Sequence, residues 1–149
     1  MEQRVEEKKA GVSVERLHED RLWVITIDEF TNENIDSWVE HVRTYQNRQA
    51  ELGDATKRYL VYDASKLPRV SMTSYLRRRS TELAKEDRPG TGRLAIVLSV
   101  PSMIRYIIDM FLSVVSRQYQ PKLKSKLFAD RQEAIAWVEE AFPEHKDKN

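Results

Sequence analysis

The side chains best suited to chemistry lie between a short apolar strand and the helix that follows it. The segment DASKLPRVSMTSYL begins at Asp63 and carries three hydroxyls within four residues, at Ser71, Thr73 and Ser74. Hydroxyls at a helix start accept hydrogen bonds from backbone N–H groups that lack a partner, and each such cap contributes about 1 kcal/mol. The same helix end also favours a bound phosphate. The cluster, with Asp63, is therefore either a helix cap or a candidate phospho-acceptor or anion site.

Basic residues flank this hydroxyl cluster on both sides. Arg69 precedes it, and Arg77, Arg78 and Arg79 follow it in the predicted helix. Guanidinium groups pair strongly with phosphate, so these residues could complete an anion site. A run of arginines on a helix is also typical of a solvated face. The alternative to solvation is an anion or an acidic partner.

Carboxylates and histidines do not form a second pattern of reactive groups. Asp28, Glu29 and Asp63 follow predicted strands, and open α/β sheets often place their sites at such strand ends. An acid–base pair is one interpretation, but each carboxylate equally suits the end of a strand or a turn. The three histidines are far apart in the sequence and lack the spacing of metal ligands. We expect a protein that is not an enzyme, with no catalytic residue, metal or cofactor.

Glycines are too few to build a phosphate-binding loop. The chain has four of them, and the segment RPGTGR (88–93) lacks the pattern of a P-loop or a dinucleotide-binding turn. We interpret Gly90 and Gly92 as turn residues.

Composition restricts the class of protein further. The 149 residues suit one domain, and 25 basic against 24 acidic residues give a formal charge of +1. Nucleic-acid-binding domains usually carry a strongly basic surface, so we expect no nucleic acid. The chain has no cysteine, which fits a reducing cytoplasm. We expect a cytoplasmic protein, because the charged N-terminus does not resemble a signal peptide and no apolar run reaches the roughly 18 residues of a transmembrane segment.

Hydrophobic periodicity divides the chain into one domain with two charged ends. Residues 1–10 and 143–149 show no apolar periodicity and are predicted to be tails around a domain at 11–142. Within it, β-rich runs alternate with helical patterns after an initial hairpin. The predicted strands lie near 12–17, 22–28, 58–62, 94–99 and 125–128. The predicted helices begin at Thr31 or Asn32, at Ser71, near Pro101 and after Asp130.

This order predicts an α/β fold. Strands that alternate with helices form parallel crossover units, and the N-terminal hairpin adds antiparallel strands. We therefore expect a mixed β-sheet in which the last three strands are parallel, covered by helices.

The helix predicted from about 102 to 119 carries more apolar residues than one packing face needs. At about 100° per residue they cover an arc of roughly 240°, whereas packing on a sheet needs a stripe of about 100° or somewhat more. We assign one stripe to the core: Ile104, Ile107, Ile108, Phe111 and Val115. We assign the adjacent stripe to an interface or ligand patch: Met103, Tyr106, Met110 and Val114.

Three arrangements would account for this second stripe. A neighbouring helix or loop could cover it, or a second copy of the chain could, since twofold homodimers are the commonest oligomers. In the third arrangement the helix lines a pocket for an apolar ligand, together with Trp23, Trp38 or Tyr106.

The order of elements and the segment DASKLPRVSMTSYL resemble the STAS domain of the anti-sigma-factor antagonists, the SpoIIAA-like fold. In that family a strand ending in Asp leads to an Asp-Ser-Ser-Gly turn whose second Ser is the phospho-acceptor. In this chain the strand Asp matches Asp63 and the acceptor position matches Thr73, while Ser71 and Ser74 stand where the family has Asp and Gly. The resemblance covers roughly residues 12–142. It implies a non-enzymatic regulatory or protein-interaction module, and we expect a homodimer.

The C-terminal pattern FADRQEAIAWV (128–138) is similar to uncharacterised bacterial STAS-like and Sec14-like single-domain proteins. The Sec14-like resemblance implies the alternative function, a small-molecule or lipid-binding carrier that uses the apolar 103–115 helix.

Overall fold

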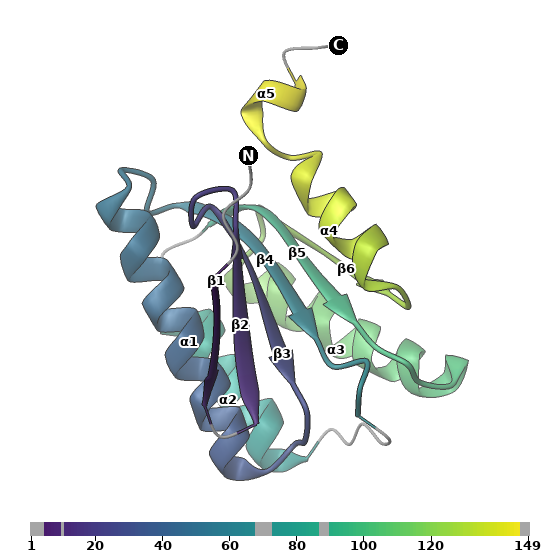
Figure 1. Ribbon diagram of the computed structural model, residues 1–149. Coiled ribbons are helices and arrows are strands. Elements are labelled where there is room, and N and C mark those ends of the chain that lie inside the picture. Colours follow the sequence, from purple (N-terminus) through teal and green to yellow (C-terminus); the bar gives the residue numbers. More distant parts are fainter. Residues whose placement is uncertain (1–4, 10, 68–72, 87–89, 147–149) are drawn as a thin grey trace.

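The chain folds into a single six-stranded mixed sheet with helices on both faces (Figure 1). The computed structural model describes residues 5–9, 11–67, 73–86 and 90–146. The strands are β1 (Val5–Lys9), β2 (Val12–Leu17), β3 (Leu22–Ile27), β4 (Lys57–Asp63), β5 (Thr91–Val97) and β6 (Leu123–Phe128). The helices are α1 (Asn32–Glu51), α2 (Ser74–Glu86), α3 (Ser102–Tyr119), α4 (Arg131–Glu139) and α5 (Pro143–Lys146).

The strand order across the sheet follows the order in the sequence. Antiparallel pairing joins β1 to β2 and β2 to β3, and parallel pairing joins β3 to β4, β4 to β5 and β5 to β6. The predicted α/β class, with a mixed sheet that has an antiparallel N-terminal part and parallel later strands, is confirmed.

Two predicted boundaries are wrong. Val5–Lys9 forms the edge strand β1, although residues 1–10 were predicted to be a tail. The sequence VEEKK shows no apolar alternation because an edge strand has only one neighbour, and charged residues protect such an edge from pairing with other chains. Pro143–Lys146, predicted to belong to the C-terminal tail, forms the short helix α5.

Gly92 lies inside β5 and is not the predicted turn residue. Its φ is +114°, and a Cβ at this position would lie 2.2 Å from the carbonyl oxygen of Arg58. Arg58 pairs with Gly92 in the β4–β5 register. Glycine is therefore required here because the backbone of β4 approaches too closely for any side chain.

The strand order decides which face each helix covers. The crossovers through α1, α2 and α3 each advance by one strand in the same direction. Right-handed crossovers that advance in one direction lie on one face of the sheet. The opposite face is left for α4, which packs on β4, β5 and β6.

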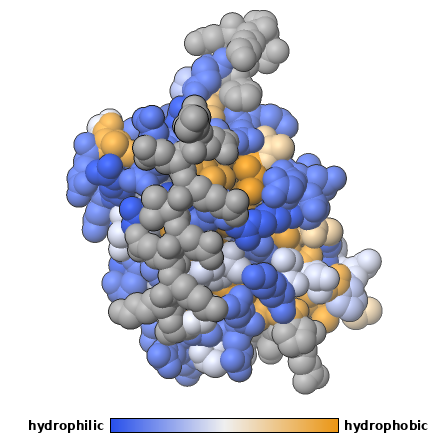
Figure 2. Space-filling model, viewed as in Figure 1, coloured by the Kyte–Doolittle hydropathy of each residue, from blue (hydrophilic) through white to orange (hydrophobic). Residues whose placement is uncertain are grey.

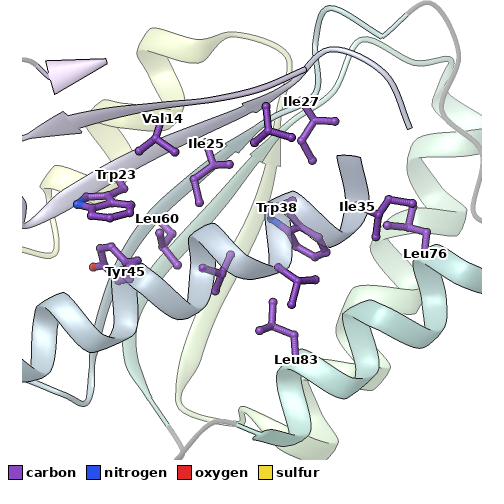
Figure 3. Packing of buried hydrophobic residues seen from close by; sticks show 13 residues of the cluster. Val14, Trp23, Ile25, Ile27, Ile35, Trp38, Tyr45, Leu60, Leu76 and Leu83 are labelled. Carbon is purple, nitrogen blue, oxygen red and sulfur yellow. The ribbon is translucent and has the colours of Figure 1, made fainter. Parts of the chain in front are cut away.

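Apolar clusters fill the space on both faces. Figure 3 shows the α1 face, where Trp23 and Ile25 of β3 point toward α1 and Trp23 packs edge to face on Tyr45 with ring centroids 5.4 Å apart. The Tyr45 hydroxyl donates to the Arg21 carbonyl oxygen (3.0 Å) and accepts from the Tyr59 backbone N–H (2.8 Å). Burial raises the pKa of Tyr45, so this hydroxyl stays protonated and keeps α1 joined to the sheet.

Candidate functional site

Asp63 ends β4 and is held in an ion-pair network on the α4 face. The side chain is buried, and its Oδ2 accepts a hydrogen bond from Arg131 Nη1 (3.1 Å). Its Oδ1 accepts from the backbone N–H (2.9 Å) and the hydroxyl (2.6 Å) of Ser65. Arg131 also donates to Glu15 Oε2 (2.7 Å) and to Thr26 Oγ1 (3.3 Å). These bonds fix Asp63 as a counter-charge for the first turn of α4.

The sheet topology does not create a crevice at these strand ends. Open α/β sheets bind ligands where the strand order reverses and adjacent crossover helices lie on opposite faces. Here the parallel strands β3 to β6 follow one another without reversal. The carboxylates predicted as strand terminators therefore do not face a cleft of that kind.

Thr73 caps α2 through its side chain, as predicted for Ser71 or Thr73. Its Oγ1 accepts a hydrogen bond from the Leu76 backbone N–H (3.1 Å), and its carbonyl oxygen accepts from the Arg77 N–H (3.0 Å). Thr73 and Ser74 are exposed, while Ser71 lies outside the described residues. Among the described residues, no hydrogen bond joins Thr73 to the buried Asp63.

The three arginines of α2 have different environments. Arg77 and Arg78 are exposed, and Arg78 lies 3.5 Å from Glu82. Arg79 is mostly buried and donates to Asp36 of α1 (3.1 Å) and to Glu82 (3.2 Å). The interpretation of a solvated face is therefore wrong for Arg79, which connects two helices.

Helix α3 has two apolar faces that point in opposite directions. Ile108 is buried against the sheet, and the half-buried residues around it are Ile104, Phe111, Leu112 and Val115. The residues of the outer face are between 52% and 76% exposed: Met103, Tyr106, Ile107, Met110 and Val114. We call this outer set the α3 stripe. All four residues predicted for the interface or ligand patch belong to it.

Ile107 was predicted to be a core residue, and this prediction is wrong. It is 53% exposed. At about 100° per residue it projects about 40° from Met103 and 60° from Met110, and about 100° from Ile108. The helical spacing alone placed it equally well in either stripe. The geometry of the sheet decides in favour of the outer one.

An apolar cavity lies between the sheet and helices α1, α2 and α3. Its volume is about 180 Å³, and it is partly open to solvent. Side chains from β4, β5 and all three helices line it, including Leu60, Ile96, Trp38, Leu83 and Phe111. Of the three aromatic residues predicted for a pocket, only Trp38 lines this cavity. Trp23 packs on Tyr45, and Tyr106 is exposed.

Arg58 is the cavity residue that the sequence patterns did not predict. It precedes Leu60 and Tyr62 on the same face of β4, because alternate residues of a strand share a face. Arg58 is 5% exposed, yet with the described residues its side chain forms hydrogen bonds only from Nη1, to the carbonyl oxygens of Ala55 (2.6 Å) and Lys57 (3.1 Å). A charged residue at an inward position of an alternating strand is the signal that could have identified it.

The surface that Figure 2 displays is mostly hydrophilic over α1, with hydrophobic atoms exposed in separate areas. Among the residues that the structure describes, no cluster of three His, Asp or Glu side chains could hold a metal ion. None of the described helices is both long enough and apolar enough to cross a bilayer.

Comparison with known proteins gives no relative for this chain. No protein-family model matches it, and no curated protein and no solved structure shows a significant match.

Proposed function

We propose that this chain is a non-enzymatic regulatory or protein-interaction module that associates with a second copy of itself through the α3 stripe. The observation that carries the proposal is the position of the exposed apolar side chains. Of six large hydrophobic residues that are exposed in the described part of the chain, five belong to the α3 stripe and the sixth is Leu52. Contiguous exposed apolar surface of this kind usually marks an interaction site.

The spacing of the stripe supports a second copy as the partner. Met103, Ile107, Met110 and Val114 are separated by four, three and four residues. This is the spacing of the apolar seam of a coiled coil, with β-branched residues at alternate seam positions. The order of the spacings, four, three and four, is the same from either end of the helix. An antiparallel pair about a twofold axis between Ile107 and Met110 therefore brings each apolar side chain opposite an apolar side chain of the other copy.

The length of the seam sets an expectation for the strength of association. From Met103 to Val114 the helix rises by about 17 Å, so the contact is short compared with the interfaces of permanent dimers. We expect a dimer that dissociates on dilution. Methionine and tyrosine suit its centre, because both are enriched in interface cores.

The test is the oligomeric state of three proteins measured by native mass spectrometry and light scattering over a range of concentrations. The wild type is expected to be dimeric at high concentration. Met110→Asp places a carboxylate in the seam and should shift association by at least tenfold in concentration, because a buried charge without a partner is costly. Leu52→Asp is the matched control, since it makes the same kind of change at the exposed hydrophobic residue outside the stripe.

Two results would contradict the proposal. A wild type that stays monomeric at its highest soluble concentration would exclude a second copy as the partner. A wild-type dimer that Met110→Asp leaves intact would place the contact elsewhere on the surface. Circular dichroism of each variant must show the wild-type fold for either result to count.

A further inference from the structure

Arg58 is a buried cation that faces the apolar cavity, and none of the carboxylates that the structure describes pairs with it. Arg58 lines the cavity between the sheet and helices α1 to α3 and is 5% exposed. No Asp or Glu of the described residues forms an ion pair with it. Removing a charge from water is costly unless the charge is paired, so a buried arginine normally has an anionic partner.

The other charged side chains that are buried in the described part of the chain follow that rule. Glu15 and Asp63 are buried on the opposite face of the sheet, and both bind Arg131, at 2.7 Å and 3.1 Å. Arg58 differs from them because both of its hydrogen bonds go to backbone carbonyl oxygens. These bonds use Nη1 and hold the guanidinium in place. Nε and Nη2 form no hydrogen bond with the described residues.

The polar groups near Arg58 already form hydrogen bonds with one another. Gln120 is buried, and its Oε1 accepts from the Gly90 N–H (2.9 Å) while its Nε2 donates to the Ala84 carbonyl oxygen (3.1 Å). Gln120 therefore closes this end of the cavity and joins α3 to the end of α2. The remaining wall is mostly apolar, with Leu60, Leu83 and Leu94 among its residues.

We propose that the cavity binds a small organic monocarboxylate, with its apolar body between the sheet and the helices and its carboxylate on Arg58. A guanidinium presents its N–H donors in a planar fork that matches the two oxygens of a carboxylate. The apolar wall binds the rest of the ligand by excluding water. Helix α3 lines this site with its inner side, whereas the α3 stripe lies on its outer side. The two sites are therefore separate.

The volume limits the size of the ligand. An engineered cavity of about 150 Å³ lined by apolar residues binds benzene, and the cavity here measures about 180 Å³. A benzene ring with one carboxylate is of the right order. Pockets for drug-sized molecules occupy about 300–1,000 Å³, so a lipid with two acyl chains is too large. The Sec14-like resemblance implied a small-molecule or lipid-binding carrier as the alternative function. The volume of the cavity therefore disfavours a carrier of lipids with two acyl chains.

The test compares an anion with its neutral analogue on the full-length protein. Benzoate and benzyl alcohol are titrated separately, and binding is measured from backbone amide chemical shifts and from the rise in melting temperature. We expect the wild type to bind benzoate at least about tenfold more tightly than benzyl alcohol, because a hydrogen bond to a charged group is worth more than a neutral one. The shifted amides should belong to the strands and helices that line the cavity.

Three variants separate the charge from the cavity. Arg58→Met should abolish the preference for benzoate and keep the binding of benzyl alcohol. Arg58→Lys keeps the charge but loses the planar fork, and should give an intermediate preference. Ala84→Leu adds volume at the cavity wall and should weaken both ligands without removing the preference. If Arg58→Met does not fold, Arg58→Lys and the wild-type preference decide the question.

Several results would overturn this proposal. Equal affinity of the wild type for the two ligands would mean that Arg58 does not meet the carboxylate. No binding of either ligand would mean that the cavity is closed in solution. Amide shifts confined to surface arginines would show benzoate acting as an adventitious counter-ion only. None of these results depends on whether the chain dimerises, so this inference and the proposed function can fail separately.

Discussion

Helices α3 and α4 lie on opposite faces of the same sheet and use their apolar residues differently. Helix α4 has nine residues, and three of them, Ala134, Ile135 and Val138, are buried on β4, β5 and β6. Helix α3 has twice that length, and Ile108 is its only buried residue. It contacts the edge strand β6 and helix α2.

The two helices also differ in the bonds at their ends and sides. Asp130 caps α4 by accepting from the Glu133 N–H (2.9 Å), and Arg131 in its first turn binds two buried carboxylates. Helix α3 begins after Pro101, which forms no side-chain cap. The difference shows that α4 is held in place by its cap, its ion pairs and its buried face. Helix α3 has an inner face on a cavity and an outer face that the fold does not use.

The largest expected effect comes from comparing two single variants, each of which replaces a valine by aspartate in one of the two helices. Val138→Asp buries a carboxylate in a core position that is fully shielded, and should cost more than about 4 kcal/mol, enough to unfold a typical domain. Val114→Asp makes the same change at a residue that is 59% exposed. It should alter the free energy of unfolding by no more than about 0.5 kcal/mol.

Urea denaturation followed by circular dichroism measures both changes. It should be performed at low protein concentration, because association stabilises the folded state by mass action. Comparable destabilisation by the two substitutions would break the comparison, since the outer face of α3 would then be covered within one molecule.

The second expected effect concerns charge. Arg131→Met leaves Asp63 and Glu15 without their shared cation, and removing one partner of a buried pair typically costs about 3–5 kcal/mol. We expect about 2–4 kcal/mol, because the Arg131 side chain is itself 28% exposed. Arg117→Met on α3 is the matched control, since Arg117 is exposed and forms no ion pair with the described residues. A loss below 1 kcal/mol for Arg131→Met would mean that the network contributes little to holding α4.

The sequence was sufficient to predict most of this fold. Local signals located five strands and the parallel crossovers, the cap of the first helix to Thr31 or Asn32, of which Thr31 is the cap, and the cap at Asp130. These local signals failed where the structure of a segment depends on the segments that lie next to it in space. β1 has a charged sequence and is a strand because β2 pairs with it, and Gly92 looks like a turn residue until the approach of the Arg58 backbone is known.

The candidate sites could be predicted only in part, for the same reason. The spacing in α3 indicated two stripes but could not assign Ile107, because the direction of the sheet is not contained in one helix. The hydroxyl cluster correctly indicated a cap at Thr73. Arg58 was missed because its importance depends on what does not pair with it, which is a property of the folded surroundings. The size of the cavity could not be predicted for the same reason, since the cavity exists only where three helices meet the sheet.

The smallest expected effect would show what limits the attachment of α3 to the rest of the domain. Replacing Pro101 by Asp gives α3 the kind of cap that α4 already has. The cap should contribute about 1 kcal/mol, but the loss of proline makes the unfolded chain more flexible and costs about 0.4–1 kcal/mol. The net change in the free energy of unfolding should therefore lie within about 0.5 kcal/mol, while Asp130→Ala on α4 should lose about 1 kcal/mol. Hydrogen exchange should show better protection of the first turn of α3 in Pro101→Asp and an unchanged dimer. A gain well above 1 kcal/mol would mean that the uncapped end, and not the shortage of buried residues, is what keeps α3 weakly attached.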